Sequence, residues 1–280
     1  MKEKITYKKF LLPSLLGILI FYLLPYLASF YYAFTSAKTG AFVGLDNYTR
    51  ILGSASFSIA SHNTLLFMLI CVPLNIIIPF MLAYAIHKEG KKSFIVLAFM
   101  LPLVIPSGAT VYFWRVLFGN YGFINKILIS NGLETVNFFQ SQATLYIVTL
   151  VFLMKNIGFN MVLFISGLGY IPKEYYELAK VEGCSKWYIM RRITFVYIVP
   201  TAFMTLLMSV INSFKIFREI YLLFGNYPYT SVYMLQHYVN NLFSQAALQS
   251  LSALSTMISL IVAVVVIVLY IGQRKLAKDF

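Results

Sequence analysis

The chain has 280 residues, of which 60% are hydrophobic, 17% are aromatic and only 11% are charged. Ordinary soluble domains carry about 25% charged residues, so this composition excludes a water-soluble globular protein. The net charge of +13 would suit a nucleic-acid binder, but the basic residues are spread over short segments between long apolar runs, and no continuous basic patch remains for phosphates. Cys71 and Cys184 show no disulfide framework and are expected to be free thiols.

Six nearly uncharged stretches are long enough to cross a membrane as helices, a length of about 20 residues. They cover residues 10–34, 63–86, 93–114, 142–168, 193–214 and 251–271. None is as short as the apolar core of a signal peptide. The connections between them are too short for a separately folded soluble domain. The sequence therefore predicts an all-α membrane protein with six transmembrane helices, built as a single transmembrane domain over residues 1–280.

The distribution of Lys and Arg between alternate connections predicts the orientation in the membrane, because cationic segments resist translocation. One set of connections carries fifteen basic residues and the other only four. The first set is Lys2, Lys4, Lys8, Lys9, Lys88, Lys91, Lys92, Lys173, Lys180, Lys186, Arg191, Arg192, Arg274, Lys275 and Lys278; the second is Lys38, Arg50, Arg115 and Lys126. We therefore expect both termini in the cytoplasm of a multi-pass plasma-membrane protein.

Two of the predicted helices contain pairs of prolines. Pro73 and Pro79 lie in the second, and Pro102 and Pro106 lie in the third. Proline removes a backbone donor, so neither helix can be straight with a complete hydrogen-bond ladder. Such helices either line a cavity or reflect the general tolerance of membrane helices for proline, and the sequence leaves both readings open.

The connection at residues 169–192 is the most densely charged part of the chain and has the pattern of a folded element. Pro172 lies where a helix would start, and acidic residues follow in its first turns, where the helix dipole favours them. Gly183 can end this helix, and a second helical pattern begins at Ser185. We predict two short amphipathic helices joined at Gly183. Their apolar residues, including Trp187, would be unfavourable in water and indicate a cytosolic partner.

The pattern in this connection resembles the loop of permease subunits of binding-protein-dependent ABC importers. The matching residues are Glu177, Leu178, Ala179, Gly183, Ile193 and Pro200, which correspond to a Glu-Ala-Ala, x3, Gly, x9, Ile-x-Leu-Pro motif. The departures are Leu178 for the usual Ala, Glu182 for Asp, Cys184 for Ala, and Val196 and Val199 in place of Pro and Leu. Residues 42–48, 114–125 and 214–221 resemble segments of the carbohydrate-uptake (maltose-type) members. The Gly-Gly-Pro that often follows is replaced here by a sequence starting at Gly225.

The resemblance implies the type I importer permease fold, with a cytoplasmic coupling helix between helices four and five that docks on an ATPase. Tyr175, Leu178 and Ala179 would pack against that ATPase, Glu177 and Glu182 would make polar contacts and caps, and Gly183 would form the turn. ATP and Mg would be bound by the ATPase subunits, since this chain has no phosphate-binding loop and is not itself an enzyme. The implied partners are a second permease, cytoplasmic ATPases, an external solute-binding protein, the lipid bilayer and a sugar substrate.

Polar residues within the apolar stretches are candidates for the substrate pathway, because ionisable groups in membranes are rare and usually functional. Lys155, Asn156 and Asn160 form a polar stripe in the fourth stretch, where Lys155 alternatively makes a structural bond to a carbonyl freed by a helix break. Asn212 could bind sugar hydroxyls through its amide. Lys215 is a further candidate, although it could simply pair with Glu219 at i+4.

Two other classes of function compete with an importer permease. A secondary transporter driven by an ion gradient usually needs a buried carboxylate or histidine relay. Here only Glu219 among the acids lies near a span, and His62, His87 and His237 lie at span ends or in a connection. A membrane-embedded enzyme would need a metal-ligand cluster or an activated nucleophile, and the sequence shows neither pattern. The pattern favours the importer permease.

Overall fold

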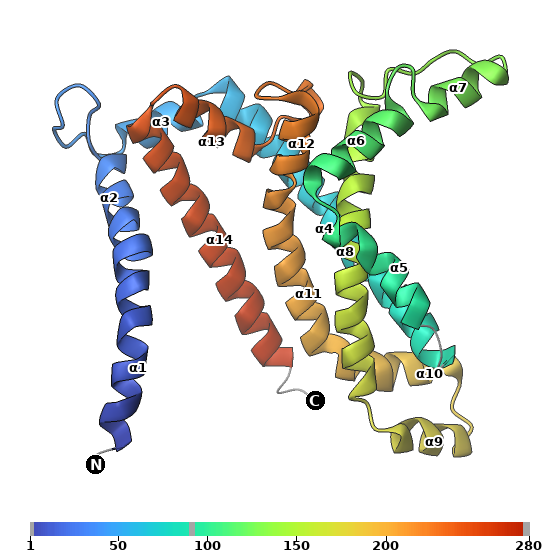
Figure 1. The fold of residues 1–280 in the computed structure, drawn as a ribbon. Coiled ribbons are helices and arrows are strands. Elements are labelled where there is room, and N and C mark those ends of the chain that lie inside the picture. Colours follow the sequence, from blue (N-terminus) through green and yellow to red (C-terminus); the bar gives the residue numbers. More distant parts are fainter. Residues whose placement is uncertain (1–2, 90–92, 277–280) are drawn as a thin grey trace. The chain divides into compact units, whose positions relative to one another are not determined.

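A computed structural model describes residues 3–89 and 93–276 (Figure 1). The described residues fall into two compact units. One takes its residues from Met1–Ser58 and Tyr238–Val264, and the other from Ile59–His237 and Val265–Phe280. The described part of the chain is helical and contains no β-strand, only one isolated bridge between Thr35 and Phe42.

The first unit contains the first membrane-spanning segment and the first part of the last one. The first segment consists of α1 (Glu3–Ile18), a π-helical turn (Leu19–Leu23) and α2 (Leu24–Ala33). A loop connects α2 to α3 (Asp46–Leu52), and the first residues of α4 (Ala55–Glu89) complete the N-terminal part of the unit. The C-terminal part of the chain adds most of α13 (Leu235–Ser244) and the first half of α14 (Leu248–Leu276).

A small apolar core with polar anchors holds the first unit together. Its fully buried residues include Ala33, Ile51 and Leu254. The Asn47 side chain is also buried and donates hydrogen bonds to the carbonyls of Ala33 at 2.9 Å and Thr35 at 3.0 Å, which fixes the loop between α2 and α3. Most side chains of the first span are exposed, as expected for a surface that faces lipid.

The second unit is built around α8 (Ala143–Gly169), the most buried of the long apolar helices. It packs most extensively against α5 (Ser93–Val104) and next against α11 (Phe195–Lys215). Gly158 permits the close approach to α5, because a Cβ at this position would collide with the backbone of Phe99. Two apolar clusters line α8, one around Phe67 and Phe152 and the other around Phe164. α8 is therefore the central helix of this unit.

Several shorter helices of the second unit, which also includes most of α4, lie at the two ends of α8 (Figure 1). Near one end are α6 (Ser107–Phe118), α7 (Phe123–Ser130), α12 (Phe217–Phe224) and a 3-10 turn (Thr230–Val232). At the opposite end are α9 (Lys173–Val181), α10 (Lys186–Ile189) and a π-helical turn (Met190–Thr194) that leads into α11.

The third predicted span is not one helix. It is broken between α5 and α6, and the chain direction changes by 100° at the break. Pro106 causes the break: it has no N–H to bond back to Pro102, and its extended ψ of 142° starts a new helix at Ser107. The described residues thus contain five long apolar helices, or six spans if this bent pair counts as one. By contrast, α4 runs through Pro73 and Pro79 without interruption.

The second of the two short helices predicted for the connection at residues 169–192 extends beyond that connection. α9 is separate, but α10 continues through the π-helical turn directly into α11. Ser185 starts α10 as an N-cap, where its Oγ accepts a hydrogen bond from the N–H of Tyr188 at 3.2 Å. The second element is therefore the base of the fifth span.

Candidate functional site

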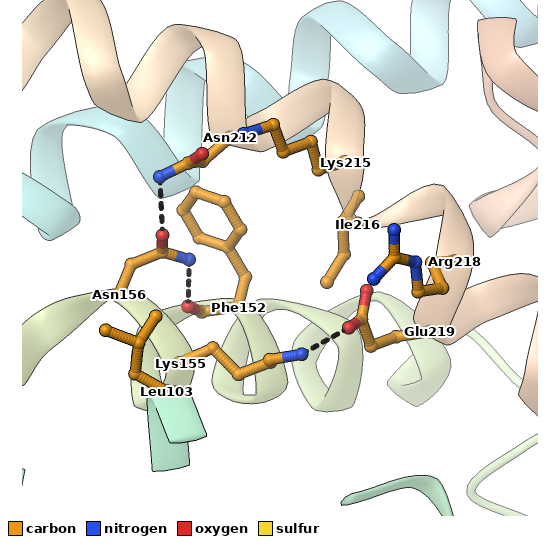
Figure 2. Close-up of a pocket in the computed structure, with 9 residues that line it drawn as sticks. All are labelled: Leu103, Phe152, Lys155, Asn156, Asn212, Lys215, Ile216, Arg218 and Glu219. Atoms are coloured by element: carbon orange, nitrogen blue, oxygen red, sulfur yellow. Dashed lines mark hydrogen bonds and ion pairs between the residues drawn. The ribbon is translucent and has the colours of Figure 1, made fainter. Parts of the chain in front are cut away.

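A cavity of about 220 Å³ opens in the second unit beside the middle of α8 (Figure 2). Its walls come from α8, the end of α5 and the junction of α11 with α12. The lining residues are Leu103, Phe152, Lys155, Asn156, Asn212, Lys215, Ile216, Arg218 and Glu219. We call this the charged cavity. It includes four of the five pathway candidates from the sequence: Lys155, Asn156, Asn212 and Lys215.

An ion pair crosses one side of the charged cavity. The Nζ of Lys155 lies 2.5 Å from Oε1 of Glu219, and the two side chains are 19% and 6% exposed. Ser107, the first residue of α6 after the proline break, donates from its Oγ to the same carboxylate oxygen at 2.8 Å and accepts from Lys155 at 3.1 Å. The pair satisfies charges that would be costly if buried alone, and it ties α8, α6 and α12 to one another.

Two asparagines form the opposite side. Asn212 donates from Nδ2 to Oδ1 of Asn156 at 2.9 Å, and Asn156 donates from its own Nδ2 to the carbonyl of Phe152 at 2.8 Å (Figure 2). The Oδ1 of Asn212 has no partner in the described part of the chain, so it can accept a hydrogen bond from a hydroxyl group. The pair fits recognition of a polyhydroxylated ligand.

Lys215 and Glu219 do not pair as the i, i+4 spacing suggested, because the carboxylate of Glu219 is bound by Lys155 and Ser107. Lys215 is exposed at the cavity wall, and so is Arg218. Neither Arg218 nor Ser107 was predicted from the sequence to be part of this site. The signal available for Ser107 was its place directly after Pro106, where a proline break exposes a new helix start.

Asn160 does not line the charged cavity. It is buried and donates from Nδ2 to the carbonyl of Asn75 at 2.9 Å. That carbonyl would normally accept from the residue four positions later, which is Pro79 and has no N–H. Asn160 thus completes the hydrogen bonding of α4 at its proline, with Ser209 bound by Asn75 Nδ2 at 2.9 Å beside it. The structural role that the sequence analysis considered for Lys155 is therefore taken by Asn160.

The segment formed by α9 and α10, which we call the elbow, begins at the end of α8 distant from α7 (Figure 1). Its helix α9 ends in a Schellman motif. Gly183 has φ of 72°, its N–H donates to the carbonyl of Lys180 at 3.1 Å, and the N–H of Cys184 donates to that of Ala179 at 2.9 Å. A side chain at residue 183 would be strained in this conformation, so the glycine determines the direction in which α10 leaves.

One face of α9 holds the elbow to the rest of the second unit. The hydroxyl of Tyr176 is 3.1 Å from Oγ1 of Thr194, and the Tyr175 ring packs on that of Tyr197 at 5.6 Å between centroids. Burial raises the pKa of Tyr176, so its hydroxyl stays protonated and able to donate. Ala179 belongs to this inner face, since it is only 7% exposed. Its expected place on the partner-facing side is corrected: its small side chain lets α9 lie close to its own chain.

The other face of the elbow is exposed and apolar. Leu178 and Trp187 are 61% and 64% exposed, and Val181 is exposed as well. The carboxylates of Glu177 and Glu182 are exposed beside them. Such a set of exposed large apolar residues on a polar connection marks a contact surface for another protein.

The described residues offer no group of three or more His, Cys, Asp or Glu side chains that could hold a metal ion. Residues 63–280 match the family described as the binding-protein-dependent transport system inner membrane component. The chain belongs to this family. It is therefore a multi-pass permease component of an ABC importer in the plasma membrane, and not an enzyme. The family is named for its dependence on a binding protein, which is therefore a partner of this permease.

Relatives and solved structures agree with this assignment. The permease is 26% identical over 278 residues to the arabinooligosaccharides transport system permease protein AraP of Bacillus subtilis (strain 168), covering 97% of this chain and 88% of AraP. It is 27% identical over 225 residues to the trehalose/maltose transport system permease protein MalF of Thermococcus litoralis, covering 78% and 76% of the two chains.

A crystal structure of a bacterial ABC transporter involved in the import of the acidic polysaccharide alginate contains a chain of the same fold. The TM-score is 0.85 at 23% identity, and the match covers 98% of this permease and 96% of that chain. The predicted all-α permease fold is confirmed.

Proposed function

We propose that this permease forms part of the pathway by which a sugar or oligosaccharide enters the cell, delivered by an external solute-binding protein and driven by ATP hydrolysis in partner subunits. The two relatives described above are named for transport of oligosaccharides or disaccharides. The charged cavity supports the proposal from the side of the structure, because its paired amides fit hydroxyl groups.

The elbow is proposed to lie on the cytoplasmic side, with both termini. This orientation is supported by the basic residues of the elbow and of the π-helical turn that follows it, since positive charge collects on the cytoplasmic side. They are Lys173, Lys180, Lys186, Arg191 and Arg192. Of the other basic residues behind the expectation, Lys2, Lys91, Lys92 and Lys278 lie outside the described residues, as do the side chains of Lys4, Lys8, Lys9, Lys88 and Lys275.

The coupling role rests on one observation: an exposed apolar face on an elbow that a Schellman turn and Tyr176 hold in a fixed direction. In the proposal Leu178 contacts the ATPase together with the outer part of Tyr175, whose side chain stays 46% exposed although its ring packs on Tyr197. Glu177 and Glu182 are polar neighbours of this contact. Ala179 and Gly183 act indirectly, by setting the position and direction of that face. ATP and Mg are bound by the ATPase, and the whole chain serves as one permease domain.

Alternating access follows from this arrangement. ATP binding draws the ATPase subunits together and moves the elbow, which changes the accessibility of the charged cavity from one side of the membrane to the other. Lys155, Asn156, Asn212 and Lys215 line the proposed pathway, and Asn160 stabilises its neighbouring helices. A ligand or nucleotide shifts this equilibrium only through its different affinity for the two states.

The test uses the complete importer, co-expressed with a tag on this permease. Leu178→Asp places a charge on the exposed face of α9 and is expected to lower the amount of co-purified ATPase and the ATP-dependent uptake of a labelled oligosaccharide into vesicles. Tyr121→Ala is the matched control, because Tyr121 is 94% exposed but lies beside α7 at the other end of α8. Normal ATPase recovery and uptake with Leu178→Asp would refute the coupling role, and uptake that requires an ion gradient but no ATP would refute the importer.

A further inference from the structure

The charged cavity contains more positive than negative charge. Lys155, Lys215 and Arg218 line it together with a single carboxylate, that of Glu219. That carboxylate is already occupied, because Lys155 and Ser107 both bind its Oε1. The ion pair cancels one positive charge and leaves two.

Neither Lys215 nor Arg218 has an acidic partner among residues 3–89 and 93–276. Both lie on one side of the helical segment at the α11–α12 junction, three residues apart, and both reach the same cavity (Figure 2). Figure 2 shows the Lys215 side chain pointing toward Asn212 and the Arg218 guanidinium on the side of Glu219, so the two positive charges are available at two places along the cavity.

The positions of Lys215 and Arg218 in the chain indicate that their charges have a function. Both lie inside the long apolar segment Lys186–Phe224, which has the length and composition of a membrane span. A cation in such a segment is unfavourable unless it faces water or a counter-charge, and such residues mark ion and substrate pathways. A cavity for a neutral sugar needs hydroxyl-binding groups such as Asn156 and Asn212. A neutral sugar would not compensate the charges of Lys215 and Arg218, whereas an acidic one would.

We infer that the charged cavity selects an acidic oligosaccharide, one that carries carboxylate or sulfonate groups. Lys215 and Arg218 each bind an acidic group of the ligand, Asn212 binds a hydroxyl, and the Lys155–Glu219 pair forms a neutral wall. Arg is suited to a planar carboxylate because its guanidinium offers two parallel donors. This inference rests on the proposed import function and names the class of its substrate.

The experiment measures ligand binding to the complete importer in lipid nanodiscs by saturation-transfer NMR. The probes are trigalacturonate and its fully methyl-esterified form, which has the same sugar chain without charge. Trigalacturonate is expected to bind about tenfold or more tightly than the ester, the factor expected for one or two charge-assisted hydrogen bonds. In Lys215→Gln, Arg218→Gln and the double variant this difference should shrink or vanish.

Lys38→Gln serves as the matched control, since it removes an exposed positive charge in the loop after α2 and is not among the residues that line the cavity. It should keep the full preference for trigalacturonate. Equal binding of acid and ester to the unmodified importer would overturn the inference, and so would a preference that survives in the double variant. Loss of the second permease from the double variant would also overturn it, because the cations would then pair with a carboxylate of that subunit.

The outcome is separable from that of the proposed function. ATP-dependent uptake of a neutral oligosaccharide with no preference for the acidic probe would leave the importer intact and remove only the charge selectivity. Absence of ATP-dependent uptake for every sugar tested would count against the proposed function itself.

Discussion

Replacing Glu219 by Gln would keep the shape of the side chain but remove the negative charge that Lys155 faces at 2.5 Å. The Gln oxygen can still accept from Ser107, so the change isolates the charge from the hydrogen bond. The ammonium of Lys155 would then remain in a site where only 19% of its side chain is exposed. An uncompensated charge in such a place destabilises the fold.

The size of the effect follows from burial. Removal of one partner from a buried ion pair costs about 3–5 kcal/mol. The partial exposure of Lys155 and the acceptor that remains favour the lower end, so we expect Glu219→Gln to cost about 3 kcal/mol. Lys155→Gln should cost a comparable amount by leaving the carboxylate alone. In the double variant Lys155→Gln/Glu219→Gln no charge remains, and two amides can bond to each other.

The assay is a double-mutant cycle on the thermal unfolding midpoint of the assembled importer in nanodiscs. Both single variants should unfold at lower temperature than the unmodified protein, and the double variant should recover most of the loss. A double variant whose midpoint falls by the sum of the two single shifts would show that the charges act independently, and the reasoning would then be wrong.

Three further predictions concern the second unit. Gly158→Ala should sharply reduce the folded fraction in size-exclusion chromatography, because a Cβ would meet the backbone of α5; Gly169→Ala, with open space around it, should not, and equal profiles would contradict the close approach. Burial lowers the pKa of His237 from 6.5 to about 4, so the unfolded chain takes up a proton before the folded one as the pH falls. Stability should drop between these two values by up to about 3 kcal/mol, and His237→Gln should flatten this part of the thermal-unfolding profile; an unchanged profile would argue against a buried neutral imidazole. Tyr176→Phe removes the bond to Thr194 and should weaken the attachment of α9 by about 1 kcal/mol, seen as faster hydrogen exchange in α9 but not in α8. Unaltered exchange in α9 would mean that other contacts hold the elbow.

The apolar stretches, and the residues at which the helix of the elbow starts and ends, could be predicted from the sequence because each depends on local chemistry. Length and apolar composition define a span, and a proline followed by acids and a later glycine defines a short helix. Gly183 indeed has a positive φ and ends α9. Pro106 was recognisable as an interruption, but a 100° change of direction depends on what packs around the break.

Partners across the structure could not be read in the same way. Lys155 binds Glu219, 64 positions away, whereas the sequence suggested the local pair of Lys215 with Glu219. A buried lysine in an apolar segment is destabilising without a counter-charge, whereas the exposed Lys215 is solvated. The carboxylate of Glu219 therefore pairs with Lys155 and not with Lys215. The inward orientation of Ala179 was missed for a related reason, since helical periodicity shows two faces but not which of them meets its own chain.

The unbroken passage from α10 through the π-helical turn into α11 has a mechanical consequence. From Lys186 to Lys215 the backbone forms one continuous helical segment, which changes direction where α10 passes through the π-helical turn into α11 (Figure 1). Its foot is in the elbow, and its far end carries Asn212 and Lys215. Movement of the elbow is thus passed to the cavity wall through continuous helix, with the π-helical turn and Pro200 as the two places where that helix can bend.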